Sequence, residues 1–175
     1  MEIVTRVNRD QLVTTALELI ELVRARIVAG IDTSAFDGRP WDAALEAWAR
    51  SYLAAFAAHP NVILLLATTP IRDVSTLGMY DRVIASLVEA GWPVGDAVAV
   101  MRTVEAHVLG SAIDIVAPGD LLEQGSVPSE HAAFRAALDP SLGDAFGARR
   151  AFEIGLSALL AGLRVRHAAG AGLHA

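Results

Sequence analysis

The chain contains no cysteine among its 175 residues. This absence excludes disulfide bonds, thiolate metal sites and thiol nucleophiles. The first residues also lack the apolar core of a signal peptide. The most apolar stretch, residues 53–70, is interrupted by His59-Pro60, so no uninterrupted run is long enough to predict a membrane helix. We therefore expect a soluble, cytoplasmic protein without a membrane partner.

Positive charge is scarce. Lysine and arginine together number 14 against 20 aspartate and glutamate residues, and the net charge is −6. Contacts with phosphates supply most of the non-specific affinity of proteins for nucleic acids. An acidic chain without a basic block is therefore expected to bind DNA poorly by itself.

Catalytic motifs are missing as well. The sequence has neither a Gly-x-Ser-x-Gly nucleophile turn nor a glycine-rich phosphate loop. A diiron bundle needs Glu-x-x-His pairs on facing helices, and Glu105-Ala106-His107 has the wrong spacing. We expect no enzymatic activity and no cofactor.

Helical periodicity runs through the whole chain, and no stretch alternates as a β-strand would. Asp73 is a candidate N-cap, and Gly91 is a candidate left-handed helix end. Together with the apolar spacing, these signals predict about six helices, at approximately 10–27, 41–58, 74–90, 94–116, 129–138 and 145–167. The predicted fold class is all-α.

Two of these helices suggest more than a fold class. Residues 94–116 are apolar nearly all round, so that helix must be covered on most sides. The last helix has two adjacent seams, one of small and one of large apolar residues. The small seam consists of Ala151, Gly155, Ala158 and Gly162; the large seam consists of Phe152, Leu156, Leu159 and Leu163. Two readings remain open, a fully buried central helix and a homodimer built from these two helices of each chain.

Several short motifs occur in an order that resembles the C-terminal domain of tetracycline-repressor-type (TetR family) regulators. Ile154-Gly155-Leu156 and Ala161-Gly162-Leu163 resemble the Phe-Gly-Leu and Gly-Leu elements of its last helix. Residues 66–70 resemble its Leu-Gly-Thr-Arg-Pro turn, residues 89–92 its helix break, and residues 108–110 its Thr-Leu-Gly element. The resemblance implies a helical sensor domain that dimerises through a four-helix bundle, with Leu109 and the small seam at the interface.

The N-terminus resembles the same family at an internal position. Residues 5–12, TRVNRDQL, resemble the place where the DNA-recognition helix ends and the helix linking to the ligand domain begins. We therefore expect residues 1–10 to be the end of a helix-turn-helix DNA-binding domain whose remainder is absent from this sequence. Residues 11–167 would form the ligand-binding and dimerisation domain, and residues 168–175 a flexible tail.

The resemblance also implies a ligand site, with one important departure. Leu65 stands where tetracycline-binding members carry a histidine that ligates the drug-bound magnesium, and Trp48 and Val83 replace polar residues that grip the drug. Magnesium prefers oxygen ligands in a near-octahedral shell, so a magnesium–tetracycline effector and any other metal are not expected. The candidate ligand-binding residues are Trp48, Tyr52, Leu65, Thr68, Val83, His107 and Asp114.

Alternatives remain open at several of these positions. Trp48 and Tyr52 share a helical face and are either a stacking wall for a ligand or ordinary core residues. His107 and Asp114 lie on a polar stripe that either anchors a ligand or satisfies itself by hydrogen bonding. Arg102 and Glu105, one turn apart, are expected to form an ordinary ion pair rather than part of a site.

These observations lead to one functional expectation and one alternative. The expectation is the sensor and dimerisation domain of a TetR-type repressor, which binds a small, mostly apolar effector and so controls DNA binding by the helix-turn-helix. The alternative is a free-standing helical small-molecule-binding or interaction protein without DNA-binding activity.

Overall fold

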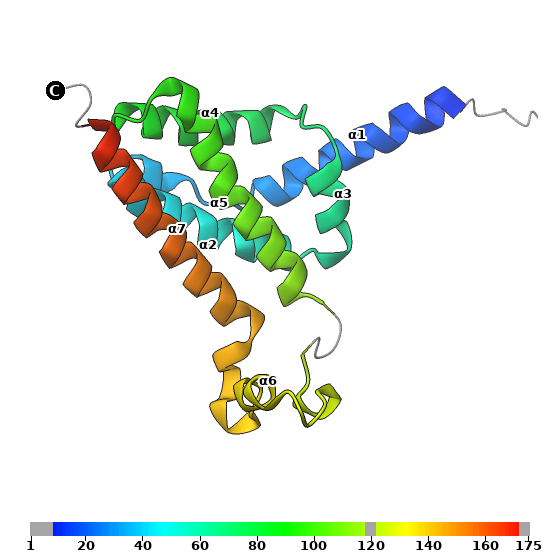
Figure 1. Cartoon of the computed structure of the whole chain (residues 1–175). Helices are drawn as coiled ribbons and strands as arrows, with labels where there is room; N and C mark the ends of the chain where they lie inside the picture. The colour runs from blue at the N-terminus through cyan, green and yellow to red at the C-terminus, as the bar shows by residue number, and fades with distance from the viewer. Residues whose placement is uncertain (1–8, 118–121, 172–175) are drawn as a thin grey trace, which may run out of the picture.

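The computed structural model describes residues 9–117 and 122–171, and this part of the chain contains seven α-helices and no strand (Figure 1). The predicted all-α fold class is confirmed. The expected DNA-binding remnant falls mainly on residues 1–8, which lie outside the described residues, as do residues 172–175 of the expected tail.

Helix α1, Arg9–Val28, projects from the body of the molecule (Figure 1). Between residues 13 and 22 it exposes apolar side chains, namely Val13, Leu17, Leu19 and Leu22. Its last turn is buried at Ile27 and Val28. The apolar residues of this helix therefore do not form one buried stripe. The helix packs against α2 and α4, and among its residues 13–28 the buried ones lie between Arg24 and Val28.

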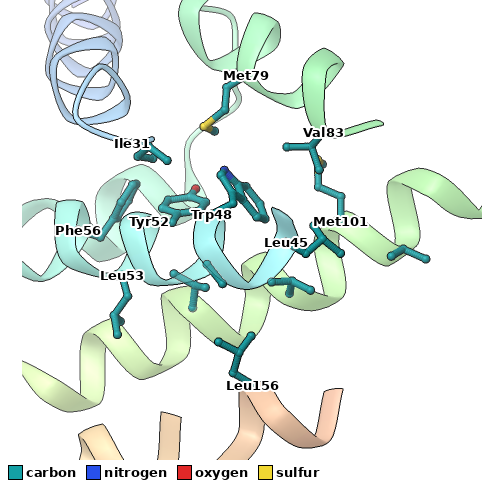
Figure 2. Close-up of a cluster of buried hydrophobic side chains, with 14 of the residues drawn as sticks. Ile31, Leu45, Trp48, Tyr52, Leu53, Phe56, Met79, Val83, Met101 and Leu156 are labelled. Atoms are coloured by element: carbon teal, nitrogen blue, oxygen red, sulfur yellow. The ribbon is translucent and has the colours of Figure 1, made fainter. Parts of the chain in front are cut away.

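Helix α2, Trp41–Ala57, follows the short η1 helix, Ser34–Phe36, and forms the centre of the core. Trp48, Tyr52 and Phe56 follow one another along this helix (Figure 2). The helix also packs against α5. Its four- and three-residue spacing thus produces the buried stripe predicted from the sequence.

Two short helices join α2 to the segment before α4. They are η2, Pro60–Val62, and α3, Ile63–Thr68. Helix α4, Val74–Glu89, begins at Asp73, whose carboxylate accepts a 2.8 Å hydrogen bond from the Thr76 amide. The helix ends at Gly91 with φ 95°, where the amide of Trp92 donates to the Leu87 carbonyl at 3.0 Å. Both predicted signals therefore act as expected: a side-chain N-cap and a left-handed glycine at the C-terminus.

Helices α5, Val94–Ile115, and α7, Ala148–Ala171, pack against each other along one side of the molecule (Figure 1). Between them lie η3, Gln124–Ser126, α6, Ala132–Ala137, and η4, Pro140–Phe146. Helix α7 begins at Ala148 rather than after Asp144, and it continues four residues past the predicted end at His167. The described part of the expected tail is therefore helical.

The end of α7 is held by a cluster of three rings. The ring of His167 lies 5.3 Å from that of Trp41 and 5.1 Å from that of Trp92, and its Nε2 donates to the Ala90 carbonyl at 2.9 Å. This bond satisfies a carbonyl at the C-terminal end of α4. Tertiary contacts therefore extend α7 beyond the point where its sequence pattern weakens.

No single helix within residues 9–117 and 122–171 is both long and apolar enough to cross a membrane. Helix α2 and the following segment Pro60–Thr68, bent by 94°, meet that criterion only together.

Candidate functional site

A cavity of ≈ 860 Å³ lies among α1, α2, α3 and the residues that follow it, α4 and α5. Apolar side chains form most of its wall: Phe56, Leu66, Ala67, Pro70, Ile71, Leu77, Ile84, Val98, Met101, Ala106 and Leu109. Its polar wall residues are Arg24, Tyr52, Thr68, Thr69, Tyr80, Asp81, Arg102 and Glu105. A concave, mostly apolar space with a few polar groups is typical of small-molecule sites.

The polar centre of this cavity is the carboxylate of Glu105. The hydroxyl of Tyr52, from α2, donates a 2.9 Å hydrogen bond to Glu105 Oε1. The hydroxyl of Tyr80, from α4, donates to the same oxygen. Three helices thus contribute one side chain each, and their packing holds the carboxylate at the cavity wall.

Both tyrosines stay protonated far above neutral pH. Burial raises the pKa of Tyr52 most strongly, and the nearby Tyr80 and Glu105 raise it further. The pKa of Tyr80 is raised by burial and by the adjacent Glu105 carboxylate. In each case the charged phenolate is disfavoured by desolvation and by like charge. The two phenols are therefore hydrogen-bond donors at physiological pH.

Arg24 connects α1 to the residues that follow α3 beside the cavity. The residue is 4% exposed, and its Nη2 donates to the Thr69 carbonyl at 2.8 Å. Its Nε lies 3.8 Å from Asp73 Oδ2. Burial raises the pKa of Asp73, but hydrogen bonds from Thr76 and Ser75 and the Arg24 charge outweigh it and lower the pKa overall. Arg24 therefore connects α1 both to the residues after α3, through the Thr69 carbonyl, and to the start of α4, through its buried ion pair with Asp73.

Two of the seven candidate ligand-binding residues lie on this wall, Tyr52 and Thr68. The Thr68 hydroxyl donates to the Leu64 carbonyl at 2.8 Å, one turn earlier in α3. Its hydroxyl oxygen therefore remains available as an acceptor.

Trp48 and Val83 occupy the core instead. Both are fully buried, and neither lies on the cavity wall. Trp48 packs against Tyr52 with ring centroids 5.2 Å apart, while Met79 and Val83 approach it from α4 (Figure 2). Trp48 therefore packs against Tyr52 on the side away from the cavity. We exclude Trp48 and Val83 from the revised candidate site.

The other three candidates also lie away from the cavity. Leu65 is 45% exposed, and Asp114 is exposed near the end of α5. His107 faces α7, where its ring stacks on Phe152 at 5.3 Å and its Nε2 donates to the Phe152 carbonyl at 3.0 Å. His107 therefore forms a hydrogen bond within the protein, which is the second of the two alternatives given for the polar stripe.

The residues predicted to form the dimer interface lie in three different environments. Ala151, Ala158 and Gly162 are exposed along α7. Gly155 instead packs against His107 of the same chain. Leu109 is half-buried and lies on the cavity wall. The large apolar seam continues through Leu160 rather than Leu159.

Sequence reasoning missed Arg24, Tyr80 and Glu105 as site residues. The expected Arg102–Glu105 ion pair is absent from the described structure, where Glu105 accepts from the two tyrosines instead. A signal for Arg24 was available, since it lies four residues from Ile20 and three from Ile27, on the inward face of α1. No local pattern pairs Glu105 with Tyr52, because they are 53 positions apart.

The comparisons with known proteins agree with this architecture. Residues 36–167 match the tetracyclin repressor-like C-terminal domain family. A solved structure, described as a possible TetR family transcriptional regulator from Streptomyces coelicolor A3(2), is similar with a TM-score of 0.70 and 26% identity. The match covers 86% of this chain and 78% of that one. Among curated proteins, none matches.

The family match spans well over half of the chain. The chain belongs to the tetracyclin repressor-like C-terminal domain family.

Proposed function

We propose that this chain is the sensor and dimerisation domain of a TetR-type transcriptional repressor, and that it binds a small, mostly apolar effector. The observation that carries the proposal is the ≈ 860 Å³ cavity, whose mostly apolar wall includes three polar side chains held by one another. Its volume falls within the range of ligand pockets. The role is binding rather than catalysis, and its place is the cytoplasm, where the regulated DNA lies.

The effector would act through α1. Arg24 and Thr69 both lie on the cavity wall, and the hydrogen bond between them ties α1 to the turn after α3. A ligand that prefers one position of α1 over another shifts the population toward that position. In a TetR-type regulator, the helix-turn-helix preceding α1 would move with it, and operator affinity would change.

Exposed apolar residues on α1 support this arrangement. Val13, Leu19 and Leu22 are all exposed on the described surface. Leu19 and Leu22 are three positions apart and share one side of the helix, whereas Val13 lies on the opposite side. Exposed apolar side chains that lie together mark surfaces that other parts of an assembly cover. The proposed helix-turn-helix, of which residues 1–10 would be the end, is suited to cover them. This chain would contact DNA only through that domain.

Homodimerisation would use α5 and α7. Ile154 and Val165, both on α7, are 56% and 72% exposed. Ala158 and Gly162 lie between them along the helix and allow close approach of a partner backbone. Isologous contact of the same two helices from each chain would give the four-helix bundle of the family.

The effector is proposed to bind without a metal. Leu65 stands where the resemblance places the magnesium-ligating histidine, and it is not on the cavity wall. The wall offers two carboxylates, Asp81 and Glu105, and one oxygen of Glu105 already accepts from two phenols. This donor set does not resemble a near-octahedral magnesium site.

The proposal is tested by ligand screening with a variant whose cavity is filled. Ala106→Trp adds a ring at an exposed position of the wall, whereas Ala133→Trp adds the same ring on α6, outside the cavity. Small aromatic compounds should raise the Tm of the wild type and of Ala133→Trp but not of Ala106→Trp. If ligands stabilise all three proteins equally, they bind elsewhere and the proposal is wrong.

A DNA-binding experiment distinguishes the proposed repressor domain from the alternative, a free-standing small-molecule-binding protein. The complete gene product, including any residues encoded upstream, should bind an operator in its own promoter region and release it on addition of a ligand from the screen. Ligand binding without any effect on DNA would favour the alternative.

A further inference from the structure

We infer that the effector is an organic cation, an aromatic or aliphatic body that carries a protonated amine which pairs with Glu105. This inference rests on the proposed function, because it specifies the chemistry of the ligand that the cavity takes. It follows from the charges on the cavity wall and from the partners of each.

Four charged side chains contribute to the wall: Arg24, Asp81, Arg102 and Glu105. Asp81 and Arg102 are exposed and can be solvated. Arg24 is buried, but the Thr69 carbonyl and Asp73 compensate its charge. Glu105 differs from all three, because it is half-buried and its hydrogen-bond partners are neutral phenols.

Partial burial removes some of the hydration of a carboxylate, and a cation that enters the cavity would compensate for that loss. Among the described residues no ion pair includes Glu105, and its neighbour Arg102 does not bond to it. The tyrosines do not neutralise it, because the raised pKa of each phenol keeps it in the protonated form, which is uncharged. The missing counter-charge is therefore a property that a ligand can supply.

The geometry leaves room for such a contact. Both phenols donate to Oε1 of Glu105, so Oε2 has no hydrogen bond from the described side chains. The buried side-chain atoms without a hydrogen-bond partner do not include Oε2, so this unpaired oxygen is accessible from the cavity. A carboxylate accepts at both oxygens, and an ammonium group can bind to Oε2 without displacing either phenol.

The surrounding rings and alkyl groups suit the rest of a cationic ligand. Tyr52 and Phe56 lie together on the wall with centroids 4.8 Å apart. Aromatic faces attract cations, and this attraction adds to a carboxylate contact. Leu77, Ile84 and Met101 offer apolar surface for a hydrophobic body. An anionic ligand in the same place would be repelled by Glu105.

Three probes of one shape test the inference: naphthylmethylamine, naphthylmethanol and naphthoic acid. Their affinities for the 175-residue chain are measured by calorimetry at neutral pH. We expect the amine to bind at least about ten-fold more tightly than the alcohol, and the acid to bind most weakly.

Glu105→Gln keeps an acceptor for the two phenols and removes the charge. It should abolish the advantage of the amine while leaving the affinity for the alcohol within about two-fold. The matched control is Glu89→Gln, which removes the same charge at an exposed position outside the cavity wall. The control should retain the wild-type order of affinities.

The outcomes separate this inference from the proposed function. Equal affinities for amine and alcohol, or tightest binding of the acid, would overturn the cation inference while the cavity remains a binding site. If none of the three probes binds, the cation inference also fails, and the Ala106→Trp screen then decides whether the cavity takes any ligand.

Discussion

The imidazole of His107 on α5 lies directly against the backbone of Gly155 on α7. A β-carbon built at residue 155 would lie 2.7 Å from Nε2 of His107, and closer still to Cε1. The same ring stacks on Phe152 at an interplanar angle of 4° and donates to its carbonyl. The glycine in the small seam of α7 is therefore required within one chain, whatever else the seam does.

Gly155→Ala should destabilise the protein by about 1–3 kcal/mol, because the added methyl group overpacks a close contact. His107→Ala makes room for that methyl group. In the His107→Ala background, Gly155→Ala should therefore cost far less, and the double-mutant cycle should show strong coupling. Denaturant unfolding measures each free energy.

Gly78→Ala serves as the matched control. Gly78 is an exposed helical residue, and a β-carbon there meets nothing within 4 Å. Its replacement should stabilise the helix by about 0.5–1 kcal/mol. Additive costs for Gly155→Ala and His107→Ala would show that the two residues do not depend on each other.

Gly162→Leu tests the dimer. A β-carbon at residue 162 meets no described residue within 4 Å, so leucine there should leave the fold of one subunit unchanged. If α7 forms the interface, the larger side chain should separate the helices, and sedimentation should show a shift from dimer to monomer. Gly78→Leu, on α4, should stay dimeric. A wild-type chain that sediments as a monomer at micromolar concentration would contradict the proposed interface.

The two tyrosines should make the fold sensitive to alkaline pH. Their pKa values are raised in the folded state by burial and by Glu105, whereas an unfolded tyrosine titrates near pH ~10. The unfolded state therefore loses protons first. The stabilisation is fully present below about pH 10 and decreases as pH rises above it, by up to about 1.4 kcal/mol per pH unit for Tyr52.

This titration is simple to observe, because the chain contains two tyrosines and no lysine. Tyrosinate absorbance should appear only together with loss of helical circular dichroism. Tyr80→Phe should reduce the slope of stability against pH above pH ~10. Tyrosinate that forms near pH ~10 in a fully helical protein would show that the phenols are not held as described.

The Arg24–Asp73 pair should contribute strongly to stability, because both side chains are at least nine-tenths buried. Arg24→Met leaves a carboxylate without its counter-charge and should cost about 3–5 kcal/mol. The Arg82–Asp37 pair is about half exposed, and Arg82→Met should cost less than about 1 kcal/mol. Similar costs for the two variants, measured by urea unfolding, would contradict the buried link.

The same pair predicts a dependence on acid pH. The pKa of Asp73 is lowered in the folded state, so its contribution is present above the unfolded value near ~3.9 and is lost as pH falls below it. Arg24→Met removes one cause of that lowering. The variant should therefore lose less additional stability on acidification than the wild type.

Trp48 should act through stability rather than through ligand contact. Trp48→Ala removes a fully buried ring and should cost about 3–5 kcal/mol. Trp48→Phe keeps most of the packing and should leave the affinity for naphthylmethylamine within about three-fold of the wild type. Loss of binding in a stably folded Trp48→Phe protein would return Trp48 to the site.

Local features were predictable from the sequence alone. The cap at Asp73, the left-handed end at Gly91 and the buried stripe of α2 each depend on residues within a few positions of one another. Their energies are decided inside one helix or one turn, so the periodicity and capping residues are sufficient to predict them. The motif order was likewise sufficient to indicate the family.

The composition of the site was decided only by tertiary packing. Trp48 and Tyr52 lie on the same face of α2, yet the first is fully buried among Phe36, α2 and α4, and the second lies on the cavity wall. Glu105 could pair locally with Arg102, but the docking of α2 and α4 brings two phenols to it instead. His107 faces Gly155 only because α7 packs against α5 at that register. Periodicity thus determined which faces of the helices are apolar, whereas long-range packing determined which residue of another helix each face meets.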